Sequence, residues 1–116
     1  MSAERSTELL THYFEAMGRD EDLAPFFTAD VSWEMVDSQT RVSGPAAVRD
    51  YILDLHSRMT SQEQPLYLVT DGHALLEGAR VNDDPAIAYC LVYDLTDDAI
   101  SAMRCYGTIA TLMPPG

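Results

Sequence analysis

A chain of 116 residues is close to the usual size of one domain, so we expect a single domain spanning residues 1–116. Apolar residues make up 47% of the chain and charged residues 22%, which is typical of a folded globular protein and excludes a disordered one. Nineteen acidic residues against seven basic ones give a net charge of −12, which argues against nucleic acid and anionic membranes as partners.

Signals for export, membrane insertion and cofactor binding are missing from the sequence. No apolar run approaches the roughly 20 residues of a membrane helix, and the start MSAERSTELL lacks the pattern of a secretion signal. With only two cysteines, we expect a cytoplasmic protein with reduced thiols. His12, His56 and His73 are widely scattered, and there is no CxxC, HxxxH or glycine-rich phosphate loop, so we expect no metal and no cofactor.

The first 60 residues predict three helices and one strand. The first helix ends at Gly18, and a short second helix over residues 22–29 has Pro25 in its first turn, where a missing N–H costs little. A strand over residues 31–36 leads into a polar loop, and the third helix begins at Gly44 and Pro45. Each element has one apolar side, made of Leu9, Leu10, Tyr13, Phe14 and Met17 in the first helix, Val31, Trp33 and Met35 in the strand, and Val48, Tyr51, Ile52, Leu55 and Met59 in the third helix.

The second half of the chain predicts two β-hairpins. Strands over residues 66–70 and 73–81 flank Asp71 and Gly72, a pair typical of a type I′ turn. Strands over residues 86–95 and 100–112 flank a turn at Asp97 and Asp98. Helices followed by antiparallel strands indicate an α+β fold, in which a curved sheet wraps the helices and leaves an apolar hollow between the layers.

A symmetric turn centred on Asp97 and Asp98 fixes the expected register of the second hairpin. Paired residue numbers then sum to 195, which sets Cys90 opposite Cys105 and Leu91 opposite Arg104. We interpret the two cysteines as small buried thiols rather than a disulfide. One face collects Cys90, Val92, Asp94, Met103 and Cys105 and is expected to look inward. The other face collects Tyr89, Leu91, Tyr93, Arg104 and Tyr106, an apolar surface large enough to predict a homodimer that covers it.

Several stretches in this order resemble one superfamily. YFEAMGRDEDLAPFFTADVSWE resembles the opening of SnoaL-like, ketosteroid-isomerase-like and nuclear-transport-factor-2-like proteins. SGPAAVRDYI is similar to their third helix, VTDGHALLEG to their first long hairpin and ISAMRCYGTIATL to their closing strand. The resemblance covers roughly residues 6–112 and implies a cone-shaped α+β barrel, with three N-terminal helices packed in a curved, mostly antiparallel sheet. It also implies a ligand pocket and frequent dimers through the outer face of the sheet.

The resemblance carries over only part of the superfamily's catalytic chemistry. Ketosteroid isomerases use an aspartate base together with a tyrosine and a protonated aspartate as hydrogen-bond donors. Tyr13 falls on the position of the donor tyrosine, but Met35 occupies that of the base, and Cys90, or Leu91 if the loop is counted differently, that of the second aspartate. The cyclases' acid on the last strand corresponds to Gly107. The Asp-Arg-Asp set of limonene-epoxide hydrolases is also absent, because the expected register puts Asp94 and Arg104 on opposite faces.

Two functions from different classes remain open. The first is a cofactor-free enzyme that isomerises, cyclises or dehydrates an apolar polyketide-like or terpenoid-like substrate by proton transfer. Tyr13 would donate a hydrogen bond, Asp94 or Asp37 would be the base, and His56 is interpreted as a solvated edge residue. The second is a non-catalytic module for dimerisation or for a hydrophobic ligand. Either way, the residues expected to line the pocket are Met17, Trp33, Met35, Tyr51, Leu55, Met59, Cys90, Val92, Met103 and Cys105.

Overall fold

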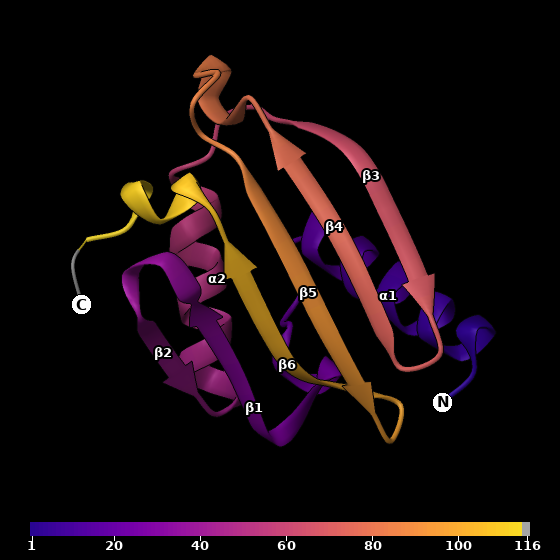
Figure 1. The fold of residues 1–116 in the computed structure, drawn as a ribbon. Helices are drawn as coiled ribbons and strands as arrows, with labels where there is room; N and C mark the ends of the chain where they lie inside the picture. Colours follow the sequence, from indigo (N-terminus) through magenta and orange to yellow (C-terminus); the bar gives the residue numbers. More distant parts are fainter. Residues whose placement is uncertain (115–116) are drawn as a thin grey trace.

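A computed structural model describes residues 1–114 and shows two α-helices on one side of a six-stranded sheet (Figure 1). The elements are α1 (Ala3–Gly18), β1 (Phe27–Met35), β2 (Thr40–Ser43), α2 (Pro45–Ser57), β3 (Glu63–Thr70), β4 (His73–Ala79), β5 (Tyr89–Thr96) and β6 (Ala99–Tyr106). The strand order is β2-β1-β6-β5-β4-β3, and every neighbouring pair is antiparallel except β1 and β6. The predicted α+β fold with a curved, mostly antiparallel sheet is confirmed.

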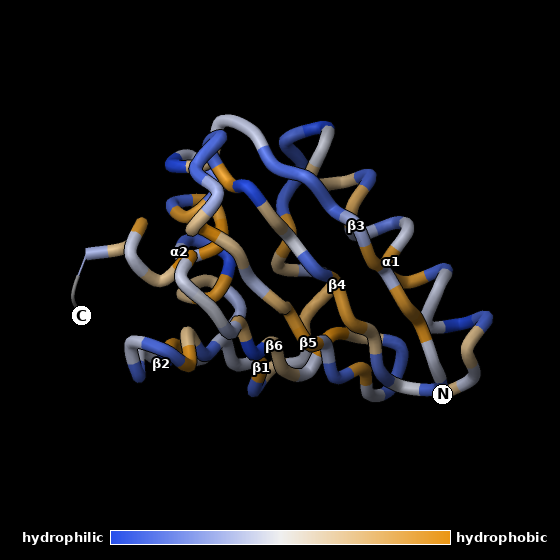
Figure 2. The backbone as a smooth tube through the Cα atoms, turned by 45° about the horizontal axis from the view of Figure 1, so that its top comes forward, coloured by the Kyte–Doolittle hydropathy of each residue, from blue (hydrophilic) through white to orange (hydrophobic). Residues whose placement is uncertain are grey.

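Both helices begin at sequence signals and bury one side. The Ser2 side chain caps α1 by accepting a hydrogen bond from the Arg5 N–H, and Pro45 occupies the first turn of α2. The buried side chains are Ser6, Leu10, Tyr13 and Ala16 in α1, and Val48, Ile52 and Leu55 in α2. Each helix therefore alternates between hydrophobic and hydrophilic segments along the tube in Figure 2. Within residues 1–114, no helix combines the length and the apolar character needed to cross a membrane.

Three segments differ from the sequence-based expectation. The expected second helix is only a three-residue 3₁₀ turn at Ala24–Phe26, because the chain already turns extended at Phe27 and pairs with β6. The polar loop after β1 contains strand β2, an edge strand with little buried surface and therefore no apolar pattern. The expected last strand ends at Tyr106, and Thr108–Leu112 form a 3₁₀ turn.

The type I′ geometry predicted for the first hairpin turn is found in the second hairpin turn instead. The β3–β4 turn pairs Thr70 with His73 around Asp71 and Gly72, and of these two turn residues only Gly72 has a positive φ, at 75°. Asp97 and Asp98 instead have φ values of 52° and 60° in the β5–β6 turn. A type I′ turn requires positive φ at both central residues, so it lies in the second hairpin rather than the first.

A β-bulge in the second hairpin overturns the predicted assignment of its two faces. Next to the turn, Leu95 pairs with Ile100 as expected, but Asp94 pairs with Ala102, so Ser101 is an extra residue on β6. From there on Tyr93 pairs with Met103 and Leu91 with Cys105. Successive side chains of a strand alternate between the two faces of the sheet. One extra residue in β6 therefore pairs its inward-facing residues with odd-numbered residues of β5, where the prediction had even-numbered ones.

The bulge therefore reverses the predicted orientation of β5 and leaves that of Met103 to Tyr106 on β6 in place. Tyr89, Leu91, Tyr93 and Leu95 are buried under the helices, whereas Cys90, Val92 and Asp94 lie on the outer face. Met103 and Cys105 point inward, and Arg104 and Tyr106 point outward, as expected. Cys90 faces Tyr106 rather than Cys105, and both thiols are free. The tyrosine-bearing face of β5 thus belongs to the core of one chain and is not available to a second copy.

Candidate functional site

A cavity of about 110 Å³ lies between the helices and the inner face of the sheet. Its helical side consists of Tyr13, Phe14 and Met17 from α1 and Ile52, Leu55 and His56 from α2. The sheet contributes Trp33, Leu76, Tyr89, Leu91, Tyr93 and Cys105, while Ile109, Met59, Gln62 and Gln64 complete the lining. Most of this surface is apolar, so its few polar groups decide what the cavity can bind.

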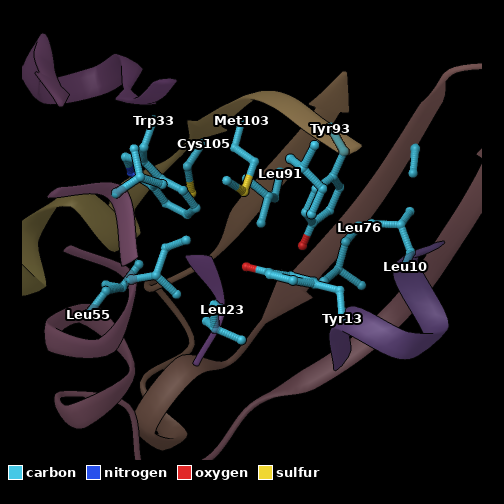
Figure 3. Packing of buried hydrophobic residues seen from close by; sticks show 14 of the residues in the cluster. Leu10, Tyr13, Leu23, Trp33, Leu55, Leu76, Leu91, Tyr93, Met103 and Cys105 are labelled. Carbon is cyan, nitrogen blue, oxygen red and sulfur yellow. The ribbon is translucent and has the colours of Figure 1, made fainter. Parts of the chain in front are cut away.

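Two tyrosine hydroxyls are the deepest polar groups of the cavity. Tyr13 and Tyr93 are only 1% and 2% exposed; in Figure 3 the Tyr93 hydroxyl is directed toward the Tyr13 side chain, and the Tyr13 hydroxyl is directed into the space between the helices and the sheet. Phe26 and Phe27 hold the Tyr13 ring, with ring centroids 5.8 and 6.0 Å away. Burial raises the pKa of both tyrosines well above the usual value, so both hydroxyls stay protonated near neutral pH.

These two hydroxyls are also free to bond a ligand. Within residues 1–114, neither hydroxyl makes a hydrogen bond to another protein group. Neither hydroxyl oxygen is fully enclosed by protein atoms, unlike the unpartnered Trp33 Nε1. A buried hydroxyl without a partner is costly, so each one needs an acceptor supplied by water or by a ligand in the cavity. Each hydroxyl can therefore donate a hydrogen bond to an acceptor atom in the cavity.

The mouth of the cavity carries the remaining polar side chains. Gln62 immediately precedes β3, Gln64 lies at its start, and His56 lies at the end of α2 with part of its surface in solvent. Surrounding protein lowers the pKa of His56, which keeps its imidazole neutral near pH 7. The Tyr89 hydroxyl donates to Gln62 Oε1 over 2.6 Å. The mouth is thus polar but uncharged.

Of the ten residues expected to line the pocket, five do so: Met17, Trp33, Leu55, Met59 and Cys105. Met35 and Met103 are fully buried in the core beside it, and Tyr51 packs against Trp33 at a centroid distance of 6.0 Å. Cys90 and Val92 are on the outer face of the sheet, because the bulge at Ser101 reverses the expected orientation of β5.

Neither candidate carboxylate reaches the cavity. Asp94 lies on the outer face and accepts two hydrogen bonds from Arg104, at 2.6 and 3.1 Å, so the expectation that these residues occupy opposite faces is wrong. Arg104 and then His73 lower the pKa of Asp94, whereas a buried base would have a raised one. Asp37 is exposed and accepts a hydrogen bond from the Gly107 N–H over 2.9 Å. No Asp or Glu side chain is among the described residues that line the cavity.

The Cys105 thiol, which also lines the cavity, is not poised to react. Burial raises the pKa of the Cys105 thiol to about 12, so it is not a thiolate at neutral pH and is a poor nucleophile. Among residues 1–114, no group of three His, Cys, Asp or Glu side chains is placed to hold a metal ion. Among the described residues, the side chains offer the cavity hydrogen-bond donation by Tyr13 and Tyr93, proton acceptance by His56, and hydrogen bonding by the Gln62 and Gln64 amides at the mouth.

Solved structures, but no family models, match this chain. No family model and no curated protein gives a match. A steroid delta-isomerase from Pseudomonas aeruginosa has a TM-score of 0.74 at 13% identity, covering 88% of this chain and 78% of that chain. An NTF2-like protein from Burkholderia xenovorans LB400 has a TM-score of 0.67 at 20% identity, covering 91% of each chain. A de novo designed protein with a curved β-sheet has a TM-score of 0.74 at 13% identity, covering 97% of each.

These likenesses define the class of fold. The chain has the cone-shaped α+β fold of nuclear-transport-factor-2-like and ketosteroid-isomerase-like proteins, as its sequence resemblance implies. Because a designed protein shares the architecture equally well, the fold by itself selects no activity. The function of this chain therefore depends on the side chains of the cavity.

Proposed function

We propose that this protein binds a small, neutral, largely apolar molecule in the cavity and holds one of its oxygen atoms between the hydroxyls of Tyr13 and Tyr93. The observation that carries this proposal is the pair of buried, protonated hydroxyls that belong to residues lining the cavity and that have no protein partner within residues 1–114. A ligand oxygen that accepts both hydrogen bonds would satisfy both groups. The missing carboxylates favour this binding role over a carboxylate-based isomerase or cyclase.

The size of the cavity restricts the ligand to about one ring. An engineered protein cavity of about 150 Å³ accommodates benzene, and the cavity here is about 110 Å³ with an open mouth. A single six-membered ring with one carbonyl fits this space far better than the fused rings of a steroid or a polyketide. The protein is negatively charged, and no Lys or Arg is among the described residues that line the cavity, which favours a neutral ligand over an anionic one.

Matched ligands test the proposal directly. Cyclohexanone and methylcyclohexane have similar size, but only the ketone has an acceptor oxygen. Fluorescence of Trp33, the only tryptophan, reports binding, and the methyl signals of Met17 and Met59 should move while those of Met1 and Met113 stay. Replacing both tyrosines by phenylalanine should weaken ketone binding about thirtyfold, since each net hydrogen bond contributes roughly 1 kcal/mol, and should not weaken hydrocarbon binding. Equal effects on both ligands would contradict the proposal.

A second candidate function is proton transfer without a cofactor, and the neutral imidazole of His56 at the mouth favours it. His56 would take a proton from the carbon beside the ligand carbonyl, and the C–H electron pair would move to form an enolate whose oxygen the two tyrosines stabilise. Exchange of these hydrogens for deuterium in bound cyclohexanone measures this step. The wild type should exceed His56→Gln, and equal rates would leave only the binding role.

The outer face of the sheet supports a proposal about assembly. Leu68 on β3 is paired with Leu75, which is paired with Val92, so these side chains form one apolar row across three strands. Leu66 and Tyr106 are 40% and 39% exposed beside it. We propose that this face, rather than one containing Tyr89, Leu91 or Tyr93, joins two copies into a homodimer.

We also propose that the protein is cytoplasmic. Its two cysteines, Cys90 and Cys105, are not bridged, as is usual in a reducing compartment.

A further inference from the structure

The structure assigns a second, specificity-determining end to the pocket: the amide of Gln62, oriented by Tyr89, selects a ligand with a second hydrogen-bond acceptor at the mouth. This inference rests on the proposed binding of one ligand oxygen by Tyr13 and Tyr93. It narrows the ligand class to neutral single-ring compounds that carry acceptor oxygens at opposite ends.

The pocket has two ends because it extends along β5. Tyr93, Leu91 and Tyr89 share the inner face of this strand, and all three line the cavity. Four residues at about 3.3 Å each separate Tyr93 from Tyr89 by roughly 13 Å along the strand. The Tyr93 hydroxyl is therefore at the enclosed end, and the Tyr89 side chain is beside Gln62 and Gln64 at the mouth.

Gly78 lets Tyr89 reach the mouth. Gly78 pairs with Tyr89 across β4 and β5, and the Tyr89 ring lies over its Cα so closely that an added Cβ would be 2.0 Å from the ring atom Cε1. Any side chain at this position would displace the ring. From there the Tyr89 hydroxyl donates to Gln62 Oε1, so the carbonyl end of the amide is occupied and its N–H₂ end remains to donate.

The backbone that carries Gln62 is fixed by an unusual residue. Asn82 has a left-handed φ of 58°, and its side-chain Oδ1 accepts hydrogen bonds from the Thr60 N–H at 2.6 Å and the Thr60 hydroxyl at 3.1 Å. Its Nδ2 donates to the Arg58 carbonyl, and its own N–H donates to the Ser61 carbonyl. Left-handed conformations of non-glycine residues are costly and cluster at functional sites. Here the hydrogen bonds of Asn82 to Arg58, Thr60 and Ser61 hold the backbone that leads to Gln62 in place before any ligand arrives.

A matched pair of ketones tests this inference. Cyclohexane-1,4-dione and 4-methylcyclohexanone have the same number of heavy atoms, but only the dione has an oxygen at its far end. In Gln62→Leu the Kd of the dione should rise about fivefold, the equivalent of one net hydrogen bond, while the Kd of 4-methylcyclohexanone changes less than about twofold. Tyr89→Phe should give a smaller change with the same selectivity, since the amide stays but loses its orientation. Gln39→Leu, the same substitution in a turn outside the pocket, should change neither Kd.

The outcomes separate this inference from the pocket proposal. If 4-methylcyclohexanone binds and Gln62→Leu affects both ketones equally or neither, the role of Gln62 is wrong and the tyrosine pair stands. If neither ketone moves the methyl signals of Met17 and Met59 in the wild type, the pocket proposal fails and the role of Gln62 fails with it.

Discussion

Asp94 and Arg104 form a two-point ion pair on the outer face of the sheet, with carboxylate to guanidinium distances of 2.6 and 3.1 Å. His73 Nδ1 lies 3.0 Å from the same carboxylate. The pair can form because the extra residue Ser101 shifts the register of β6 by one, which brings both side chains to the same face of the sheet. Asp94 is therefore a structural residue of the sheet and not a base of the cavity.

Asp94→Asn should lower stability modestly and leave ligand binding unchanged. Arg104 and His73 lower the folded-state pKa of Asp94, so its stabilising effect is present above the unfolded pKa of about 3.9 and is lost as pH falls through the folded value. A partly exposed pair contributes about 1 kcal/mol or less. The unfolding free energies of the wild type and the variant in urea should differ at pH 7, and this difference should shrink as the pH falls below about 3.9. A loss of cyclohexanone binding in this variant would contradict the placement of Asp94 outside the site.

Tyr93→Phe should weaken binding without weakening the fold. The Tyr93 hydroxyl makes no hydrogen bond to the described protein residues, so its removal takes away a buried polar group and no native contact. We expect an unfolding free energy equal to or slightly above that of the wild type, together with a several-fold higher Kd for cyclohexanone. Leu91→Ala, two residues away on the same face, should instead cost about 2–5 kcal/mol by opening a core void. A large destabilisation in Tyr93→Phe would reveal a structural role for the hydroxyl.

His56 should titrate below its usual range. Burial lowers its pKa, so the neutral base predominates above a midpoint that lies under the ordinary value of about 6.5. Any proton exchange that His56 catalyses should rise with pH through that midpoint and then level off. The stability that depends on neutral His56 should be lost as pH falls from about 6.5 through the folded pKa. NMR titration of the imidazole signals, assigned with His56→Gln, measures the midpoint. A value at or above 6.5 would contradict the burial of the ring.

A charge on the apolar row of the outer face should disrupt the proposed dimer. Leu75→Glu or Leu68→Glu would place a carboxylate in the self-complementary interface, whose burial is unfavourable without a partner. Leu53→Glu is the matched control, because Leu53 is 48% exposed on α2 and away from the sheet. Analytical ultracentrifugation at micromolar concentration should show dimers for the wild type and the control, and monomers for the row variants. A monomeric wild type would refute the dimer.

Periodicity predicted the helices and the inward residues of β1, because amphipathic spacing is a local property. Register was not predictable in the same way: the symmetric turn gave the correct pair next to Asp97 and Asp98, but one extra residue at Ser101 reversed the orientation of the rest of β5. The size of the side chains indicates the buried face of β5 better than the turn-based register does. Tyr89, Leu91 and Tyr93 alternate with the smaller Cys90 and Val92, and the larger set is the buried one.

The sequence predicted many of the apolar residues of the candidate site, but it did not predict most of the polar ones. Tyr13 and Trp33 lie on strongly periodic elements, and the sequence placed both in the pocket region. Tyr93 was missed because of the bulge. Gln62 was missed because it lies in a polar segment between elements, where its position depends on a hydrogen bond from Tyr89 and on Asn82 some 20 residues away in sequence. Such contacts between distant segments leave no local pattern.

The carbonyl stretching band of bound, ¹³C-labelled cyclohexanone tests the tyrosine pair most directly, because each hydrogen bond to the carbonyl oxygen lowers its frequency. The band of the ketone bound to wild-type protein should lie lowest, the bands in Tyr13→Phe and Tyr93→Phe should lie higher, and the band in the double variant should approach that of the ketone in an apolar solvent. An identical band in the wild type and the double variant, with the ketone bound in both, would show that the two hydroxyls do not hold the ligand oxygen.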